Sequence, residues 1–174
     1  MKTELKAKFL QHLLGKKKED EGFTLIELLV VIIIIGILSA IALPSFINQA
    51  AKAKQTEAKT TISSVNKAQQ TQRIENGAFA TAITNLSIGL TTTSTANYDY
   101  NLVAVGTGAS ATITASAKDP TSLKGYSGGV FISNPTGDAP SIICQTTGVQ
   151  GGTLATSLVP TSATVCPGPM EILK

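Results

Sequence analysis

The sequence predicts an α+β fold in which one long N-terminal helix packs on a roughly four-stranded antiparallel sheet. Residues Phe23–Leu43 form an almost continuous apolar run. Apolar residues then recur at helical spacing between Ala51 and Gln69. Short strand-like runs follow in the second half, separated by Gly, Pro, Asp and Asn. A helical segment followed by closely spaced strands is typical of this fold class, and short connections favour antiparallel pairing.

Chain length and charge exclude several classes of protein. The 174 residues allow one compact core plus one extended element, because single cores usually take about 100 to 150 residues. The net charge of +3 divides into +2 for residues 1–22, which hold six lysines and four acids, and +1 for the rest. Nucleic-acid-binding surfaces cluster Lys and Arg, so DNA binding has no support in this pattern. The later basic residues instead fit a solvated or inter-subunit helix face: Lys52, Lys54, Lys59, Lys67 and Arg73.

The apolar run Phe23–Leu43 is long enough to cross a bilayer, which takes about 20 residues. The basic cluster Lys16-Lys17-Lys18 ahead of it marks the cytoplasmic side. Helical spacing resumes after Pro44, and we expect the helix to continue to the stop signal Asn76-Gly77. A helix of roughly 50 residues is about 80 Å long. Lipid or neighbouring copies of the chain must therefore cover its first half.

The second half of the chain is predicted to form a loop, a sheet and a tail. Residues 78–97 are rich in Thr, Ser, Ala and Asn and predict a surface loop with one short helical turn. The tail from Thr146 to Lys174 is rich in Gly, Thr and Pro and predicts loose structure unless a covalent link holds it. The predicted strands are Tyr98–Val105, Ala111–Ala117, Tyr126–Ser133 and Ser141–Gln145. We interpret the tyrosines as sheet-packing residues: Tyr98, Tyr100 and Tyr126.

The only cysteines are Cys144 and Cys166, both late in the chain. Two thiols in a protein that passes a membrane usually form a disulfide, and two free buried thiols are the alternative. A structural zinc site takes about four Cys or His ligands, and the only histidine is His12. We find no Ser-His-Asp set, phosphate-binding loop or close carboxylate pair in the distal domain. We therefore expect no metal, no cofactor and no enzyme activity.

The segment Gly22-Phe23-Thr24-Leu25-Ile26-Glu27 resembles the processing site of type IV pilins and their pseudopilin relatives. The resemblance is close through Pro44 and extends to the rest of the chain in general plan, so it implies the type IV pilin fold. It implies that residues 1–22 are a class III leader peptide. A prepilin peptidase would cut between Gly22 and Phe23 and methylate the new amine of Phe23. Glu27 would then guide the incoming subunit into register.

Physical reasoning supports several of these roles. A small residue at Gly22 lets a protease approach the backbone. A carboxylate such as Glu27 within an apolar span costs about 2.5 to 3.5 kcal/mol on insertion scales, so it needs a partner. The Phe23 amine of the same or a neighbouring subunit is the nearest candidate. By resemblance, Gly36 and Pro44 lie where the helix loosens in the filament. A merely tolerated Gly36, and a Pro44 that simply ends a membrane helix, remain open.

Two other interpretations of the apolar run are possible. It could be a cleaved secretory signal, with Leu38-Ser39-Ala40 as a weak cleavage site. It could also be a plain membrane anchor. The run is too long for a usual signal peptide, and a plain anchor leaves Glu27 unexplained. Both features favour the pilin-type interpretation.

Within this class the sequence favours a pilin, the structural subunit of a type IV pilus, over a type II secretion pseudopilin, and a minor pilin remains open as an alternative. Major pseudopilins usually carry an acidic calcium-binding loop, whereas the acids here are isolated: Asp119, Asp138 and Glu171. The run Lys124–Phe131 and the two late cysteines resemble the type IV pilin-like G and H proteins of cyanobacteria. The implied partners are other copies of the chain, the prepilin peptidase and the pilus assembly platform.

The expected organisation follows from these assignments. The precursor spans the inner membrane once with its N-terminus in the cytoplasm, and the processed chain moves to an extracellular filament used for motility, adhesion or DNA uptake. The expected segments are the leader 1–22, the membrane and polymerisation helix 23–44, the amphipathic helix 45–77, the loop 78–97, and the sheet with its tail 98–174.

Overall fold

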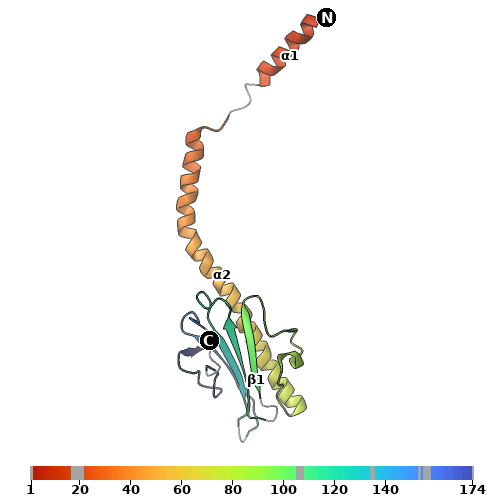
Figure 1. Ribbon diagram of the computed structural model, residues 1–174, viewed down its shortest axis with the longest axis vertical. Coiled ribbons are helices and arrows are strands. Elements are labelled where there is room, and N and C mark those ends of the chain that lie inside the picture. The colour runs from red at the N-terminus through yellow and green to blue at the C-terminus, as the bar shows by residue number, and fades with distance from the viewer. Residues whose placement is uncertain are drawn as a thin grey trace. The chain divides into compact units, whose positions relative to one another are not determined.

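The computed structural model describes residues 2–16, 22–104, 108–133, 136–152, 154 and 158–173. Val105, the predicted end of the first strand, and leader residues 17–21 lie outside these ranges. The chain divides into two compact units, Met1–Ile47 and Asn48–Lys174. We describe each unit by itself, with the elements labelled as in Figure 1.

The first unit consists of α1, Lys2–Lys16, and the beginning of α2, Leu25–Asn76. The 52 residues of α2 confirm the long helix predicted from the sequence. Pro44 lies inside this helix, so the interpretation of Pro44 as a helix end is wrong. Because proline has no N–H, the carbonyl of Ala40 lacks its usual helical donor.

The C-terminal end of α2 has a clear local cause. Gly77 adopts a φ of 69°, in the left-handed region that glycine enters without steric cost. Its N–H donates to the carbonyl of Arg73 at 3.0 Å, as is typical of a glycine that follows the last helical residue. The predicted stop at Asn76-Gly77 is therefore confirmed.

The second unit contains a five-stranded sheet in the order β1-β2-β3-β4-β5, with every neighbouring pair antiparallel. The sequence predicts roughly four strands; the fifth, β5, has only three residues and pairs with β4 through Thr146 and Met170. The strands are β1 Tyr98–Ala104, β2 Ser110–Ala117, β3 Tyr126–Phe131, β4 Ser141–Thr146 and β5 Met170–Ile172.

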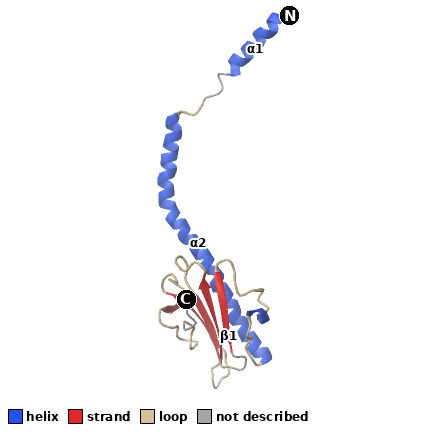
Figure 2. Ribbon diagram, in the orientation of Figure 1, coloured by secondary structure: helices blue, strands red, loops and turns tan. Residues whose placement is uncertain are grey.

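The C-terminal part of α2 covers one face of this sheet, as Figure 2 shows. Its buried residues recur every three or four positions, as expected for one helix face: Ala58, Ile62, Val65, Asn66 and Gln69. They pack with inward-facing strand residues such as Tyr98, Ile113 and Tyr126. Gly128 of β3 permits this close approach, because a Cβ there would lie 2.4 Å from the Ile62 Cγ2 atom.

Two buried polar residues of α2 bind backbone groups of other segments. The Asn66 side-chain amide donates to the carbonyl of Ile142 at 3.1 Å. The Gln69 side chain accepts from the N–H of Ala80 at 2.9 Å and donates to the carbonyl of Ala80 at 2.8 Å. The Gln69 bonds fix the loop after α2, and the Asn66 bond joins α2 to β4, because unpaired buried backbone groups are costly.

A smaller core lies on the other face of the sheet. Gly128 faces Ile62 and pairs with Ile143, so the alternating neighbours Ile142 and Cys144 point away from the helix. These two residues and Met170 form a buried cluster with residues of the tail. A disulfide joins Cys144 to Cys166, which confirms the predicted link and excludes two free thiols. The tail is therefore packed against the sheet along part of its length.

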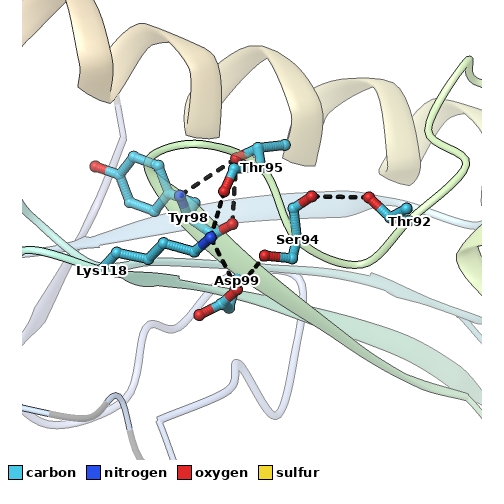
Figure 3. A network of polar contacts seen from close by, with 6 residues as sticks. All are labelled: Thr92, Ser94, Thr95, Tyr98, Asp99 and Lys118. Carbon is cyan, nitrogen blue, oxygen red and sulfur yellow. Dashed lines mark hydrogen bonds and ion pairs between the residues drawn. The ribbon is translucent and has the colours of Figure 1, made fainter.

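The loop between α2 and β1 is bound to the open edge of the sheet. Its short helix, η1, spans Ile83–Leu86 and confirms the predicted helical turn. Figure 3 shows the contacts that follow it: the Ser94 hydroxyl donates to Asp99 at 2.6 Å, and the Lys118 ammonium donates to the Thr95 carbonyl at 2.5 Å. Lys118 also lies 3.8 Å from the Asp99 carboxylate. The loop thus covers part of an edge strand that would otherwise expose backbone groups.

Candidate processing and assembly site

Helix α2 begins with a capping box formed by Thr24 and Glu27. Thr24 precedes the first helical residue, and Glu27 is the third residue of the helix. One Glu27 carboxylate oxygen, Oε2, accepts from the Thr24 N–H at 2.8 Å and from the Thr24 hydroxyl at 2.6 Å. The Thr24 hydroxyl oxygen accepts from the Glu27 N–H at 3.3 Å. The pair thereby satisfies helix donors that have no partner within the helix.

This geometry changes the interpretation of Glu27 in the uncut chain. The pairing of Glu27 with the amine of processed Phe23, inferred from the sequence, remains a prediction. Thr24 was missed as a partner, although a Thr followed three residues later by Glu, just before an apolar run, is a recognised helix-start pattern. In the uncut chain, Thr24 donates hydrogen bonds to the Glu27 carboxylate, for which the apolar side chains around it offer no donor.

The bond between Gly22 and Phe23 lies in an open stretch of backbone. Both residues precede α2, and the Phe23 side chain is 86% exposed. Gly22, Phe23, Thr24 and Glu27 line one shallow, open concavity. A Cβ at Gly22 would have no atom of the chain within 4 Å. The chain itself therefore does not require glycine at this position for packing.

Gly36 and Pro44 lie on the same exposed helix and do not contact the Thr24–Glu27 pair. A Cβ at Gly36 would also meet nothing within 4 Å, so packing inside the chain gives no reason for this glycine. Pro44 removes one helical hydrogen bond, as described above. The structure therefore brings Gly22, Phe23 and Glu27 together and places Gly36 and Pro44 further along α2.

The first half of α2 exposes an apolar surface. Every residue between 25 and 47 is exposed in the single chain, and the buried residues of α2 begin at Ala58. Large aliphatic side chains in this region are 45% exposed or more, as at Leu29. By length and composition, α2 contains one segment able to cross a membrane. Exposed apolar surface of this extent marks a contact with lipid or protein.

Comparison with protein families identifies the chain. The family model described as type IV pilin-like G and H matches residues 55–167, which is more than half of the chain. The chain belongs to the type IV pilin-like G and H family. A second model, the prokaryotic N-terminal methylation motif, matches residues 17–43. This second match contains the Thr24–Glu27 capping box and the bond between Gly22 and Phe23.

Curated relatives of this family member match it mainly in a limited region. It is 55% identical over 51 residues to the type IV major pilin protein PilA of Myxococcus xanthus, covering 29% of this chain and 23% of the relative. It is 46% identical over 61 residues to a fimbrial protein of Moraxella nonliquefaciens, covering 35% and 40%. It is 36% identical over 64 residues to type II secretion system core protein G of Pseudomonas aeruginosa, covering 37% and 45%.

The chain thus spans less than half the length of each of these relatives. No solved structure matches it.

The distal domain of this pilin-like protein presents its tyrosines to the core. Tyr98 and Tyr126 are fully buried and Tyr100 is 3% exposed, which confirms the sheet-packing interpretation. Burial raises the pKa of Tyr126 to about 12. Burial, with a smaller effect of the neighbouring tyrosines, raises the pKa of Tyr98 above its usual range. Among the described residues, His, Cys, Asp and Glu form no group of three that could hold a metal ion.

Proposed function

We propose that this chain is the structural subunit of a type IV pilus, processed by a prepilin peptidase and assembled through its N-terminal helix. One observation carries the proposal: a methylation motif extends from the processing segment into a helical surface that the chain itself leaves uncovered. A sheet domain of the pilin-like family follows that helix. A helix that first spans the membrane and later enters a filament needs apolar partners in the membrane and in the filament. This surface can contact lipid before assembly and other copies of the chain after it.

The processing chemistry follows from the exposed backbone. Hydrolysis of the amide between Gly22 and Phe23 consumes one water, releases the leader with a carboxylate on Gly22 and leaves an amine on Phe23. The same peptidase would then transfer a methyl group from a methyl-donor cosubstrate to this nitrogen, which loses one proton. Both strong hydrogen bonds from Thr24 go to the Glu27 Oε2 atom. Within the described part of the chain, no donor binds Oε1. This oxygen is therefore available to accept from the Phe23 amine of a neighbouring subunit.

Pairing between subunits would set the register of assembly. Glu27 is the only charged residue between Phe23 and Ala51. A charged amine and a carboxylate attract strongly where water is excluded, and a buried charge without its partner is strongly destabilising. Subunits that join one turn out of register would bury Glu27 without an amine. The correct register is thereby favoured over its neighbours, while the aliphatic side chains supply most of the contact area.

Mass analysis of filaments sheared from cells tests the proposal. We expect an abundant species that begins at N-methylated Phe23 and contains the link between Cys144 and Cys166. Gly22→Val should leave uncut precursor in the membrane, because a branched side chain obstructs the protease at the scissile bond. A product of normal processed mass from this variant would contradict the assigned cut site.

A second variant tests the register argument. Glu27→Ala should be inserted and cut normally yet yield few filaments, because the incoming amine has lost its partner. Glu75→Ala, at the exposed C-terminal end of α2, is the matched control and should assemble normally. Normal filament yield from Glu27→Ala would refute the role of Glu27 in register.

A type II secretion pseudopilin is the second candidate, favoured by the similarity to core protein G of Pseudomonas aeruginosa. The family match and the disulfide that holds the tail favour the pilin. Location separates the two candidates. Processed chain that stays in the cell envelope and is absent from sheared filaments would support the pseudopilin or a minor pilin instead.

A further inference from the structure

The C-terminal end of α2 contains the only Asn-Gly pair in the chain, Asn76-Gly77. Both residues are exposed. Every other asparagine is followed by a residue that carries a side chain, such as Leu102 after Asn101. A side chain on the following residue hinders its backbone nitrogen from approaching the asparagine amide carbon, and glycine imposes no such hindrance. Asn76 is therefore the asparagine whose side chain is most open to attack by its own backbone.

The reaction open to this pair is deamidation, which needs only water. The Gly77 nitrogen forms a bond to the Asn76 Cγ atom, and the bond from Cγ to Nδ2 breaks. The Gly77 nitrogen gives up its proton, and the Nδ2 group leaves with this proton as ammonia, so a cyclic succinimide remains. Water then opens the ring at either carbonyl and leaves aspartate or isoaspartate. The net change is the gain of one water and the loss of one ammonia.

In the folded chain, Arg73 holds the atoms that would have to move. Its carbonyl accepts from the Gly77 N–H at 3.0 Å, so the proton that must leave is engaged in a hydrogen bond. Its guanidinium donates to the Gly77 carbonyl and lies 5.7 Å from the ring centre of Phe79, which is 3% exposed. We call these three contacts the Arg73 clasp. They attach Gly77, at a φ of 69°, to the end of the helix and to the buried start of the next loop.

We propose that Asn76 is a site of spontaneous deamidation that the Arg73 clasp keeps unreactive while the end of α2 is folded. The last turn of a helix opens more easily than its interior, and a group that reacts only in the open form reacts at a rate set by the open fraction. Each contact of the clasp lowers that fraction. Asn76 is therefore modified slowly in the folded chain and faster wherever the helix end is open. This chemistry is independent of whether the chain forms filaments.

Once formed, either product opposes closure of the helix end. Both products carry a new carboxylate at the C-terminal end of α2, where the partial negative charge of the helix dipole disfavours an anion. Isoaspartate also carries the backbone through its own side chain. This adds one methylene between positions 76 and 77 and displaces the Gly77 N–H from the Arg73 carbonyl. The connection between α2 and Phe79 is thereby weakened.

Peptide mapping by mass spectrometry measures the reaction at each asparagine. The full chain is incubated in detergent at neutral pH, and the fraction of aspartate and isoaspartate at position 76 is followed over time. Arg73→Ala removes the guanidinium contacts and keeps the backbone carbonyl. Lys67→Ala is the matched control, because it removes an exposed positive charge of the same helix that is no part of the clasp. A parallel set of the same chains is unfolded in guanidinium chloride.

We expect deamidation at position 76 to be about ten-fold faster in folded Arg73→Ala than in the folded natural chain, because one charge-assisted hydrogen bond and one cation–π contact are lost. Lys67→Ala should react at the natural rate. In denaturant all three chains should react at one rate, faster than any folded chain, while Asn101 in the same molecules stays largely unmodified. Equal rates for the folded natural chain and folded Arg73→Ala would overturn the clasp, as would equal rates for the natural chain with and without denaturant. No reaction at position 76 in denaturant would overturn the site itself.

An Arg73→Ala chain that unfolded altogether would react at the rate seen in denaturant. The near-ultraviolet circular dichroism of the buried Tyr98 and Tyr126 detects that case. Arg73→Lys then gives the decisive comparison, because it keeps the charge and the aliphatic stem but loses the planar group that contacts Gly77 and Phe79. A folded Arg73→Lys chain that reacts at the natural rate would overturn the role of the guanidinium.

Discussion

Gly128→Ala tests how closely α2 packs on the sheet. The added Cβ would lie 2.4 Å from the Ile62 Cγ2 atom and 3.2 Å from both side-chain amide atoms of Asn66. Real Cβ atoms essentially never approach other heavy atoms within 3.0 Å, so the helix or the strand must shift. Ile62 is fully buried, and its Cγ2 branches directly from Cβ, so the methyl group cannot swing aside without changing the rotamer.

The expected effect combines two opposing contributions. Overpacking of a filled core costs about 1 to 3 kcal/mol. Replacing glycine by alanine restricts the unfolded chain and returns about 0.4 to 1 kcal/mol. We therefore expect a net loss of about 1 to 2 kcal/mol in the free energy of unfolding. For a unit of this size the loss lowers the melting temperature by about 4 °C per kcal/mol.

The assay is thermal unfolding of the full chain in detergent, followed by the near-ultraviolet circular dichroism of the buried tyrosines. Gly148→Ala is the matched control, because a Cβ there meets nothing within 4 Å and its backbone is unstrained. In an Ile62→Ala background the clash is removed, so Gly128→Ala should then cause little further loss. Equal melting temperatures for Gly128→Ala and Gly148→Ala would refute the packing argument, as would full additivity with Ile62→Ala.

Three further predictions use the same unfolding assay or a titration. Gln69→Leu should lower the free energy of unfolding by about 2 to 4 kcal/mol, because two buried backbone groups lose their partner; Gln72→Leu is the control, and equal losses would contradict this role. Replacing Cys144 and Cys166 together by alanine should lower the free energy of unfolding by about 3 kcal/mol, the chain-entropy contribution of a disulfide that closes a loop of this length. An unchanged melting temperature of the natural chain after reduction of the disulfide would contradict this prediction. Since the Tyr126 pKa is raised to about 12, stability should be retained below the unfolded value near 10 and fall as pH rises towards 12. Tyrosinate absorbance that develops near pH 10 in the folded chain would contradict that burial effect.

Much of the fold could be predicted because it is encoded locally. The helix stop at Asn76-Gly77 depends on the backbone freedom of one glycine. Four strands were predicted to within two residues at each described end, since turn-forming residues separate them. β5 was missed because three residues carry too short a pattern. Its position depends on pairing with β4 and on the distant disulfide.

The candidate site was predictable in its chemistry and less so in its geometry. The motif around Gly22 and Glu27 identified the processing segment. The charge pattern alone did not predict that the Thr24 hydroxyl binds the Glu27 carboxylate. Asn66 and Gln69 show the same limit. Helical spacing placed Gln69 on the buried face, but the backbone groups that both side chains bind belong to segments that only the tertiary fold brings near.

The two halves of α2 obtain their burial from different sources, and this separates assembly from folding. From Ala58 onward, the sheet of the same chain buries the helix. From Leu25 to Ile47 every residue is exposed in the single chain, so lipid or other subunits must supply the contact. Glu27→Ala should therefore reduce filament yield without changing the melting temperature of the sheet unit. Gly128→Ala should lower that melting temperature while processing at Gly22 remains normal. A Glu27 variant that unfolded the sheet unit would show that the two halves are coupled energetically, which the burial pattern does not predict.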